Sequence, residues 1–436
     1  MSTSVNAPVS SSHRAEGVPA QATAVVRNWR HAIIFTVLAV LAVLLCGLRA
    51  TSATVTFRLS DKHDVIRLAD VNVSAAATGW ILSVVMVLIA VYAWIVTSRG
   101  RPVGRWAVAV FWVAFIVAML VWAVSHADGN SLSLPGLLGG SLTLAVPLIF
   151  GSMSGLLCER SGVVNIAIEG QLLFGAFAAA IAGSVTHNAW VGLIAAMIGA
   201  MLVSLILASF SIKYLVNQVI VGVVINVLVS GLTGFLYSTV LSRSDVGLNA
   251  PAHLPSFAIP LLSKIPVIGP VLFDQSVIVY LMYVVVFLIW FGLSKTRWGL
   301  RTRAVGEHPK AADTLGVSVN RLRFLNVLLA GAVAGLGGAF FTLVSVSSFN
   351  KDMTAGQGYI ALAALIFGRW RPFGALFAAL LFGFATNLQS VLSLLGTTVP
   401  SQFLAMLPYV VTIAAVTGLV GRSRGPAASG VPYVKE

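Results

Sequence analysis

Long runs of apolar residues, almost free of charged side chains, constrain this chain more than any other feature. A helix needs about 20 such residues to cross the hydrocarbon core of a bilayer, and it satisfies its own backbone hydrogen bonds there. We therefore expect an all-α polytopic membrane bundle of about 10–12 transmembrane segments. The runs cover residues 32–48, 75–96, 106–125, 136–157, 164–183, 190–210, 219–240, 276–293, 324–346, 358–368, 373–390 and 403–420.

The composition agrees with a membrane protein. Hydrophobic residues make up 58% of the 436 residues and charged residues 9%, whereas soluble domains are about 45–50% apolar and about 25% charged. Soluble enzymes and secreted disulfide scaffolds are thereby excluded. Cys46 and Cys158 lie in or beside apolar runs, where cysteine acts as a small hydrophobe, so we expect neither a disulfide nor a metal site.

The run at 358–368 is too short to cross a bilayer comfortably. Three interpretations stay open for it: a tilted span, a re-entrant segment, or half of a broken helix. The number of crossings downstream depends on which of them is right.

Basic residues are distributed unequally between the loops. With the amino terminus inside and all twelve runs counted as crossings, 20 of the 27 Lys and Arg residues fall on the inner side and seven on the outer side. Cytoplasmic loops carry such an excess, so we expect both termini in the cytoplasm. The net charge of +14 is assigned to contacts with anionic lipid headgroups, and nucleic acid is not expected as a partner.

The chain divides into regions of different character. The later spans are richer in Gly and in amide side chains than the first three. A polar stretch and Pro135 interrupt the pattern near 126–136 and mark the boundary. We predict four parts: a cytoplasmic tail at 1–30, an amino-terminal extension with three spans at 31–130, a core at 131–421 and a second cytoplasmic tail at 422–436.

The longest cytoplasmic loop, 294–323, carries seven basic residues and the pattern of a short amphipathic helix. Pro309 suits a first helical turn, and Gly316 suits the position just after a helix ends. A short capped helix between two spans is either a docking element or an anchor for the loop at the lipid headgroups.

Four segments of the sequence carry a resemblance, and the loop helix is one of them. Lys310–Gly316 resembles the Ala-Ala-x-x-x-Gly core of the coupling-helix motif by which permeases of ATP-binding cassette (ABC) importers dock on their ATPase subunits. Residues 159–170, 296–309 and 356–364 resemble the bacterial nucleoside importer permeases, relatives of the branched-chain amino acid and ribose permeases. The resemblance covers about 135–420. It departs in the three amino-terminal spans, which look like an addition, and at Lys310, where the motif often has an acidic residue.

The resemblance implies the permease subunit of an ABC importer for nucleosides, located in the cytoplasmic membrane of a bacterium. ATP would be bound by partner subunits, so the chain itself needs no cofactor. The implied partners are ATPase subunits, a second permease that is a different chain, an extracytoplasmic solute-binding protein and membrane lipid. The residues implied in docking on the ATPase are Gly306, Glu307, Lys310, Ala311, Ala312, Leu315 and Gly316.

Glu169 is the one acidic residue deep inside an apolar run. A charge at the bilayer centre costs about 2.5–3.5 kcal/mol or more unless it faces protein or water, so we expect it to point into the bundle. Ser161, Asn165 and Glu169 stand at i, i+4 and i+8 and are expected to form one polar line on a helix. These polar side chains either face the transport pathway and hydrogen-bond a sugar or base, or cap backbone ends near Gly162 and Gly170.

Asn226 and Gln357 are further polar candidates, because a buried amide is costly in hydrocarbon unless it is hydrogen-bonded. Each of them either lines the pathway or joins two helices. Gly331 and Gly335 form a Gly-x-x-x-Gly pattern, which predicts close packing against a neighbouring helix.

Motifs of enzymes and ATPases are missing from the sequence. No lysine follows a glycine, so a Gly-x-x-x-x-Gly-Lys-[Ser/Thr] phosphate-binding loop is absent. No His, Cys, Asp and Glu cluster has metal-ligand spacing, and no Gly-x-Ser-x-Gly elbow occurs. We therefore expect no enzyme activity, such as action on lipid-linked sugars. The alternative to the ABC permease is an ion-coupled secondary transporter of a small polar solute, with Glu169 as the proton carrier.

Overall fold

The structure, a computed structural model, describes residues 29–49, 51–60, 67–126, 131–242, 247–394, 402, 406 and 425–435. Among these residues, ten helices are long and apolar enough to cross a membrane, which confirms the polytopic helical bundle. The predicted run at 403–420 lies outside the described residues except for Met406.

The ten spans agree with ten of the predicted apolar runs. They are α1 (Arg30–Ala42, continued by a π-helical turn to Leu48), α2 (Ala75–Ser98), α3 (Arg105–Ser125), α4 (Leu134–Arg160), α5 (Ile168–Thr186), α6 (Ala189–Ala208, continued to Lys213), α7 (Gln218–Leu236, continued to Leu241), α9 (Val277–Lys295), α12 (Val319–Phe340, continued to Ser345) and α14 (Pro372–Leu394).

Shorter elements connect the spans. The short helices are α8 (Ile268–Phe273), α10 (Arg297–Glu307), α11 (Pro309–Thr314) and α13 (Gln357–Phe367). The strands are β1 (Thr54–Arg58), β2 (Val71–Ser74), β3 (Ser131–Ser133), β4 (Ser256–Ala258) and β5 (Asp274–Ser276). β1 pairs antiparallel with β2 and parallel with β3, and β4 pairs antiparallel with β5.

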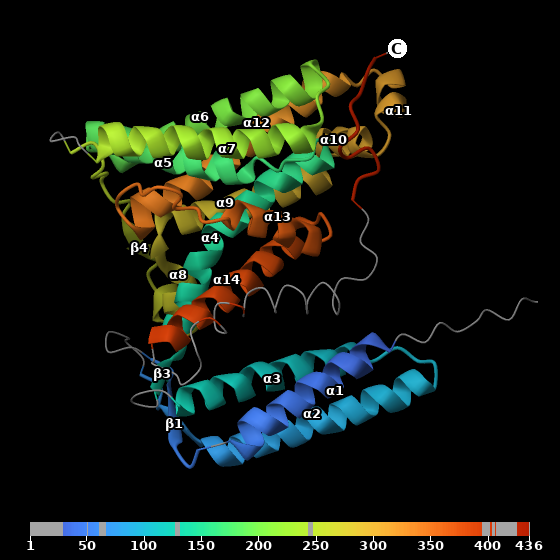
Figure 1. Cartoon of the computed structure of the whole chain (residues 1–436), viewed down its shortest axis with the longest axis vertical. Helices are drawn as coiled ribbons and strands as arrows, with labels where there is room; N and C mark the ends of the chain where they lie inside the picture. Colours follow the sequence, from blue (N-terminus) through green and yellow to red (C-terminus); the bar gives the residue numbers. More distant parts are fainter. Residues whose placement is uncertain are drawn as a thin grey trace, which may run out of the picture.

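These connections gather on two opposite sides of the molecule (Figure 1). We call the side with α10, α11 and residues 425–435 the α11 face, and the side with β1, β3 and β4 the β1 face. α1 begins toward the α11 face, and α3 ends toward the β1 face (Figure 1).

The centre of the bundle is formed by α4 and α12, of whose spans 89% and 83% are buried. Small residues let these helices approach their neighbours. A Cβ at Gly335 would lie 2.8 Å from the Ala196 carbonyl carbon of α6, and one at Gly331 would lie 2.7 Å from the Ala200 carbonyl oxygen. The Gly-x-x-x-Gly pattern is therefore a close helix contact, as predicted.

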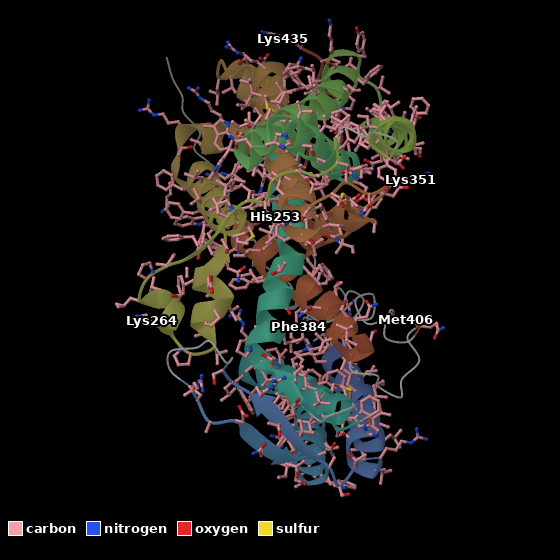
Figure 2. The ribbon with its side chains drawn as sticks, turned by 90° about the vertical axis from the view of Figure 1, so that its left-hand side faces the viewer. His253, Lys264, Lys351, Phe384, Met406 and Lys435 are labelled. Atoms are coloured by element: carbon pink, nitrogen blue, oxygen red, sulfur yellow. The ribbon has the colours of Figure 1, made fainter. Side chains whose placement is uncertain are left out.

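Helices α1, α2 and α3 lie side by side at one end of the molecule (Figure 1) and form an apolar cluster of their own. They meet the other helices where the end of α3 packs against α14. Val124 of α3, Leu388 and Leu392 of α14 and Leu137 of α4 share a second apolar cluster there. Figure 2 shows Phe384 of α14 at this junction.

The short run is α13, and the chain in front of it reaches into the bundle. Ser230 lies halfway along the 24-residue span that begins at Gln218, about 18 Å from its start. Its hydroxyl donates to Asp352 Oδ1 over 2.6 Å, so Asp352 lies at that depth. The segment between α12 and α13 is therefore not confined to an outer loop. Just after α13, the Trp370 carbonyl accepts from Arg160 Nε at the end of α4 (2.9 Å), on the side opposite the end of α12, so α13 is the helical half of a broken crossing.

Candidate functional site

The predicted docking helix is α11, with Pro309 in its first turn. The helix ends in a Schellman motif. The Gly316 N–H donates to the Asp313 carbonyl (2.8 Å) and the Val317 N–H to the Ala312 carbonyl (3.1 Å). Gly316 has φ +80°, a left-handed conformation that favours glycine. The pattern of proline and glycine thus sets both ends of α11.

The predicted docking residues divide into an outward and an inward set. Lys310 and Ala311 are exposed, and Leu315 is 85% exposed, which is unusual for a leucine. Ala312 is only 2% exposed and packs with Val305 and Val319. The outward set gives α11 a surface that a partner protein can contact.

Gly306 is buried at the end of α10, whereas Glu307 beside it is exposed. A Cβ at Gly306 would lie 3.0 Å from the Arg160 carbonyl carbon at the end of α4, so glycine is needed for this close approach. Glu307 Oε2 accepts a hydrogen bond from the Ala427 N–H (3.2 Å). Gly306 therefore fixes the end of α10 against α4, and Glu307 contacts residue 427 from the surface.

α10 is also fixed to α12 by a polar chain that passes through the amide of Asn326. Trp298 Nε1 donates to Asn326 Oδ1 (3.1 Å), and Asn326 Nδ2 donates to Thr302 Oγ1 (3.2 Å). Asn326 is buried within α12. An amide in an apolar run indicates a hydrogen-bonded contact of this kind, because such a group is paired when buried.

The predicted polar line of Ser161, Asn165 and Glu169 is wrong. Residues 161–167 form a turn between α4 and α5, and Gly162 there has φ +92°. Because the chain is not helical, the i, i+4 spacing does not place these side chains on one face. The Ser161 hydroxyl donates to the Cys158 carbonyl instead (2.7 Å).

Asn165 belongs to a fully buried polar network that joins α4, α5 and α6. Its Nδ2 donates to Gln171 Oε1 (3.0 Å), and Gln171 Nε2 donates to Ser204 Oγ (2.8 Å). Ser154 Oγ also donates to Gln171 Oε1 (3.3 Å). The partners satisfy one another, so the network fixes three helices rather than presenting free groups to a solute.

Glu169 caps the start of α13. Its Oε1 accepts from the Thr354 hydroxyl (2.6 Å) and from the Gly356 N–H (2.8 Å), and its Oε2 accepts from the Gly358 N–H (2.6 Å). A carboxylate is favourable beside the N–H groups of a helix amino end. The geometry agrees with the capping interpretation, although the capped backbone is that of α13 and not the one near Gly162 and Gly170.

Asn226 of α7 holds the same region together from the other side. Its Oδ1 accepts from the Gly170 N–H (2.8 Å), and its Nδ2 donates to the Ile166 carbonyl (2.9 Å) and to Tyr359 Oη (3.0 Å). Asn226 is therefore a joint between helices. Tyr359 is 48% exposed, so this joint ends at the surface of the bundle.

Gln357, the first residue of α13, lies beside this joint and is half-buried. Its Oε1 is buried and accepts no hydrogen bond among the described residues. An unpaired acceptor of this kind is costly unless another group reaches it.

A sequence comparison decides the family. The family model described as "Branched-chain amino acid transport system / permease component" matches residues 137–416. The chain belongs to this family. It is thus the transmembrane permease subunit of an ABC importer, a multi-pass protein of the plasma membrane, and its family is one of transporter permeases, not of enzymes. The ABC permease assignment is favoured over an ion-coupled secondary transporter.

Curated relatives of the permease carry nucleoside names. It is 40% identical to the guanosine ABC transporter permease protein NupQ of Bacillus subtilis, over 68% of this chain and 95% of the relative. It is 38% identical to the nucleoside ABC transporter permease protein NupC of Lactococcus lactis, over 67% and 95%. It is 28% identical to the guanosine ABC transporter permease protein NupP of Bacillus subtilis, over 61% and 78%. No solved structure matches the chain.

Proposed function

We propose that this permease imports nucleosides, with guanosine as the first substrate to test. The proposal rests on the names of its relatives NupQ and NupC. The alignment with this chain covers 95% of the length of each of them. ATP is bound and hydrolysed by separate ATPase subunits, and a solute-binding protein delivers the nucleoside on the other side of the membrane.

The observation that carries the coupling role is the outward surface of α11. A six-residue helix with fixed ends presents Lys310, Ala311 and Leu315 to the outside of the protein. An exposed leucine on a capped helix fits an apolar cleft in a partner. We assign this surface as the seat of an ATPase subunit, which makes the α11 face cytoplasmic.

The orientation follows from the same assignment. The residues of α10, α11 and the neighbouring ends of α9 and α12 carry the densest group of Lys and Arg in the described chain. An excess of basic residues is typical of cytoplasmic loops. Both chain ends are then cytoplasmic, since α1 begins toward the α11 face and residues 425–435 lie on it (Figure 1).

The side of α7 near α13 carries exposed charges, which indicates that a second permease subunit covers it. Lys351, labelled in Figure 2, and Asp352 are exposed, and Asp352 reaches the middle of α7 through Ser230. A charge that faces lipid at this depth would cost about 2.5–3.5 kcal/mol or more. We assign this side to the contact with a second permease and to the nucleoside pathway between the two chains. NupP and NupQ of Bacillus subtilis both bear the guanosine permease name, which supports a partner that is a different chain.

The pathway would run past Asp352, Tyr359 and Gln357. A nucleoside needs hydrogen-bond partners for its ribose and an apolar or aromatic surface for its base. The half-exposed ring of Tyr359 offers the second, and the exposed carboxylate of Asp352 offers the first.

The test is ATP-driven uptake of guanosine into proteoliposomes that carry the whole complex. Ala311→Asp places a charge on the outward surface of α11 and is expected to abolish ATPase co-purification and reduce uptake at least a hundredfold. Ala258→Asp, the same change at an exposed residue of β4 on the opposite face, is the matched control and should leave both unchanged. Normal uptake and co-purification in Ala311→Asp would refute the docking assignment.

A further inference from the structure

Residues 425–435, which belong to the predicted cytoplasmic tail at 422–436, are folded onto the α11 face. The segment runs along α10 and α11 (Figure 1), and Lys435 lies at the extremity of the molecule (Figure 2). The Ala428 N–H donates to the Gly306 carbonyl (2.9 Å) and the Gly430 N–H to the Gly162 carbonyl (3.2 Å). One short segment therefore touches both the end of α10 and the turn between α4 and α5.

Arg323 of α12 strengthens the same connection from beneath. It is 2% exposed and is among the largest fully buried side chains of the described protein. Its Nε donates to the Ser161 carbonyl (3.0 Å) and its Nη1 to the Val431 carbonyl (2.9 Å). A guanidinium can hold two acceptors in a fixed fork, which a lysine ammonium on a flexible stem cannot reproduce.

The segment also lies against the inner side of α11. Tyr433 is 8% exposed and packs in one apolar cluster with Val305, Ala312 and Val319. The Lys435 ammonium adds an exposed ion pair with Asp313 Oδ1 (3.8 Å), whose contribution to stability is small because water screens it. The buried tyrosine ring is thus the main contact from the segment to α11.

α11 needs such a support. A helix of six residues is far below the length at which an isolated helix is stable in water, and a single side chain of α11 itself, Ala312, is buried. A push on α11 would rotate it about the link at His308 unless something fixed its inner side. The segment fixes it to the turn at Ser161 and Gly162, which leads directly into α5 and Glu169.

We propose that residues 425–435 are a clasp that transmits the motion of α11 to the α4–α5 turn, with Arg323 and Tyr433 as its positioning residues. This inference rests on the proposed docking of an ATPase subunit at α11. The clasp creates a continuous path of contacts from the outward surface of α11, through Tyr433 and Val431, to Arg323, Ser161 and α5. Without it, ATP hydrolysis moves α11 but the movement is lost before it reaches α5 and the cap of α13.

The first experiment measures guanosine transported per ATP hydrolysed by the whole complex in proteoliposomes. A chain that ends at Arg424 is expected to keep the ATPase subunits and ATP hydrolysis, while guanosine moved per ATP falls at least fivefold. An unchanged ratio would overturn the clasp. A rise in uptake would also overturn it, because the segment would then be an inhibitory cover. Loss of the ATPase subunits would equally contradict it, since the segment would then be part of the docking surface.

Single substitutions separate the clasp from a general loss of folding. Tyr433→Ala and Arg323→Lys should each lower the transport ratio at least threefold with normal yield of the complex. Val434→Ala is the matched control, because Val434 is 60% exposed beside Tyr433, and it should leave the ratio within the error of the wild type. Equal ratios in Tyr433→Ala and Val434→Ala would overturn the proposal.

The proposed docking and the clasp fail in distinguishable ways. If Ala311→Asp keeps the ATPase subunits, docking at α11 is refuted and the clasp falls with it. If Ala311→Asp releases them but the chain ending at Arg424 retains the wild-type ratio, docking stands and only the clasp is refuted.

Discussion

Helices α1–α3 and helices α4–α14 are both built from apolar spans, yet they are held together differently. Residues of the α1, α2 and α3 spans are 33%, 33% and 44% buried, whereas those of α4 and α12 at the centre of the second region are 89% and 83% buried and those of its peripheral helices α7 and α9 are 39% buried. Every buried charged or amide side chain of the described residues belongs to the second region; they are Glu159, Asn165, Gln171, Gln218, Asn226, Arg323, Asn326 and Asn387. The first region has apolar and aromatic contacts without such groups, for example the stacked rings of Phe35 and Phe111 with centroids 4.0 Å apart.

The two regions therefore differ in the free energy that a rearrangement of their helices would cost. Apolar contacts in a bilayer compete with equally apolar lipid tails, so α1–α3 need only moderate packing to stay together. Buried polar groups must keep their partners or lose about 1–3 kcal/mol each. The second region therefore has fewer ways to rearrange, and the family match from residue 137 onward falls in it.

The largest expected effect comes from Gly335→Leu in α12. The added side chain has no space against the α6 backbone, and overpacking costs about 1–3 kcal/mol or more. We expect loss of all uptake and exposure of Cys158, which is fully buried in the wild type, to alkylation by a membrane-permeant maleimide. Gly139→Leu is the control, since a Cβ there meets nothing within 4 Å. If Cys158 stayed unreactive in Gly335→Leu, the second region would not depend on close packing in the way proposed here.

A smaller effect is expected at Glu169, where the cap of α13 can be weakened in two steps. Glu169→Ala removes the acceptor of three hydrogen bonds, each left unmet at about 1–3 kcal/mol, and should lower the melting temperature and the folding yield. Glu169→Gln retains the size and one acceptor oxygen and should keep measurable ATP-dependent uptake, compared at several pH values. Complete loss of uptake in the Gln variant, with normal assembly, would instead favour a direct role in the pathway.

A still smaller effect on transport is expected from Phe111→Ala, which removes the stacked pair in α1–α3. Cys46, 1% exposed in the same cluster, should become reactive toward a membrane-permeant maleimide while Cys158 stays protected. Uptake should remain within twofold of the wild type, because the polar networks of the second region are untouched. A large fall in uptake would show that the two regions are energetically coupled.

The orientation can be tested by chemical labelling, without a measurement of activity. A cysteine at exposed His308 in the second region and one at exposed Arg101 between α2 and α3 should both react with an impermeant maleimide only from the cytoplasmic side. Labelling of only one of them in intact cells would contradict a common orientation of the two regions. Labelling of both would reverse the orientation of the whole protein.

Much of the fold followed from the apolar runs, because a span of about 20 uncharged residues has few alternatives to a transmembrane helix. The ends of α11 were also predictable, since Pro309 and Gly316 act on their own local backbone. The line through Ser161 and Asn165 was predicted wrongly because Gly162 interrupts the helix. The glycine at 162 is a residue that often marks a turn, and it could have indicated that the helix ends there.

The partners of the candidate residues could not be predicted from one sequence. Glu169 meets Gly356 and Gly358 almost two hundred positions away, and no local pattern encodes such a contact. Residues 425–435 are short and have no helical period, so their packing depends on surfaces formed by α10, α11 and α12.

The three helices in front of the core have a consequence for how the protein enters the membrane. Three crossings are an odd number, so the amino end of α4 lies on the β1 face although α1 starts toward the α11 face. During synthesis α1–α3 leave the ribosome before α4, and the arginines between α2 and α3 are held back on the cytoplasmic side. Under the proposed orientation, the first helix of the core is then already aligned when the translocon receives it. With α1–α3 in this order, α4 runs from the β1 face to the α11 face.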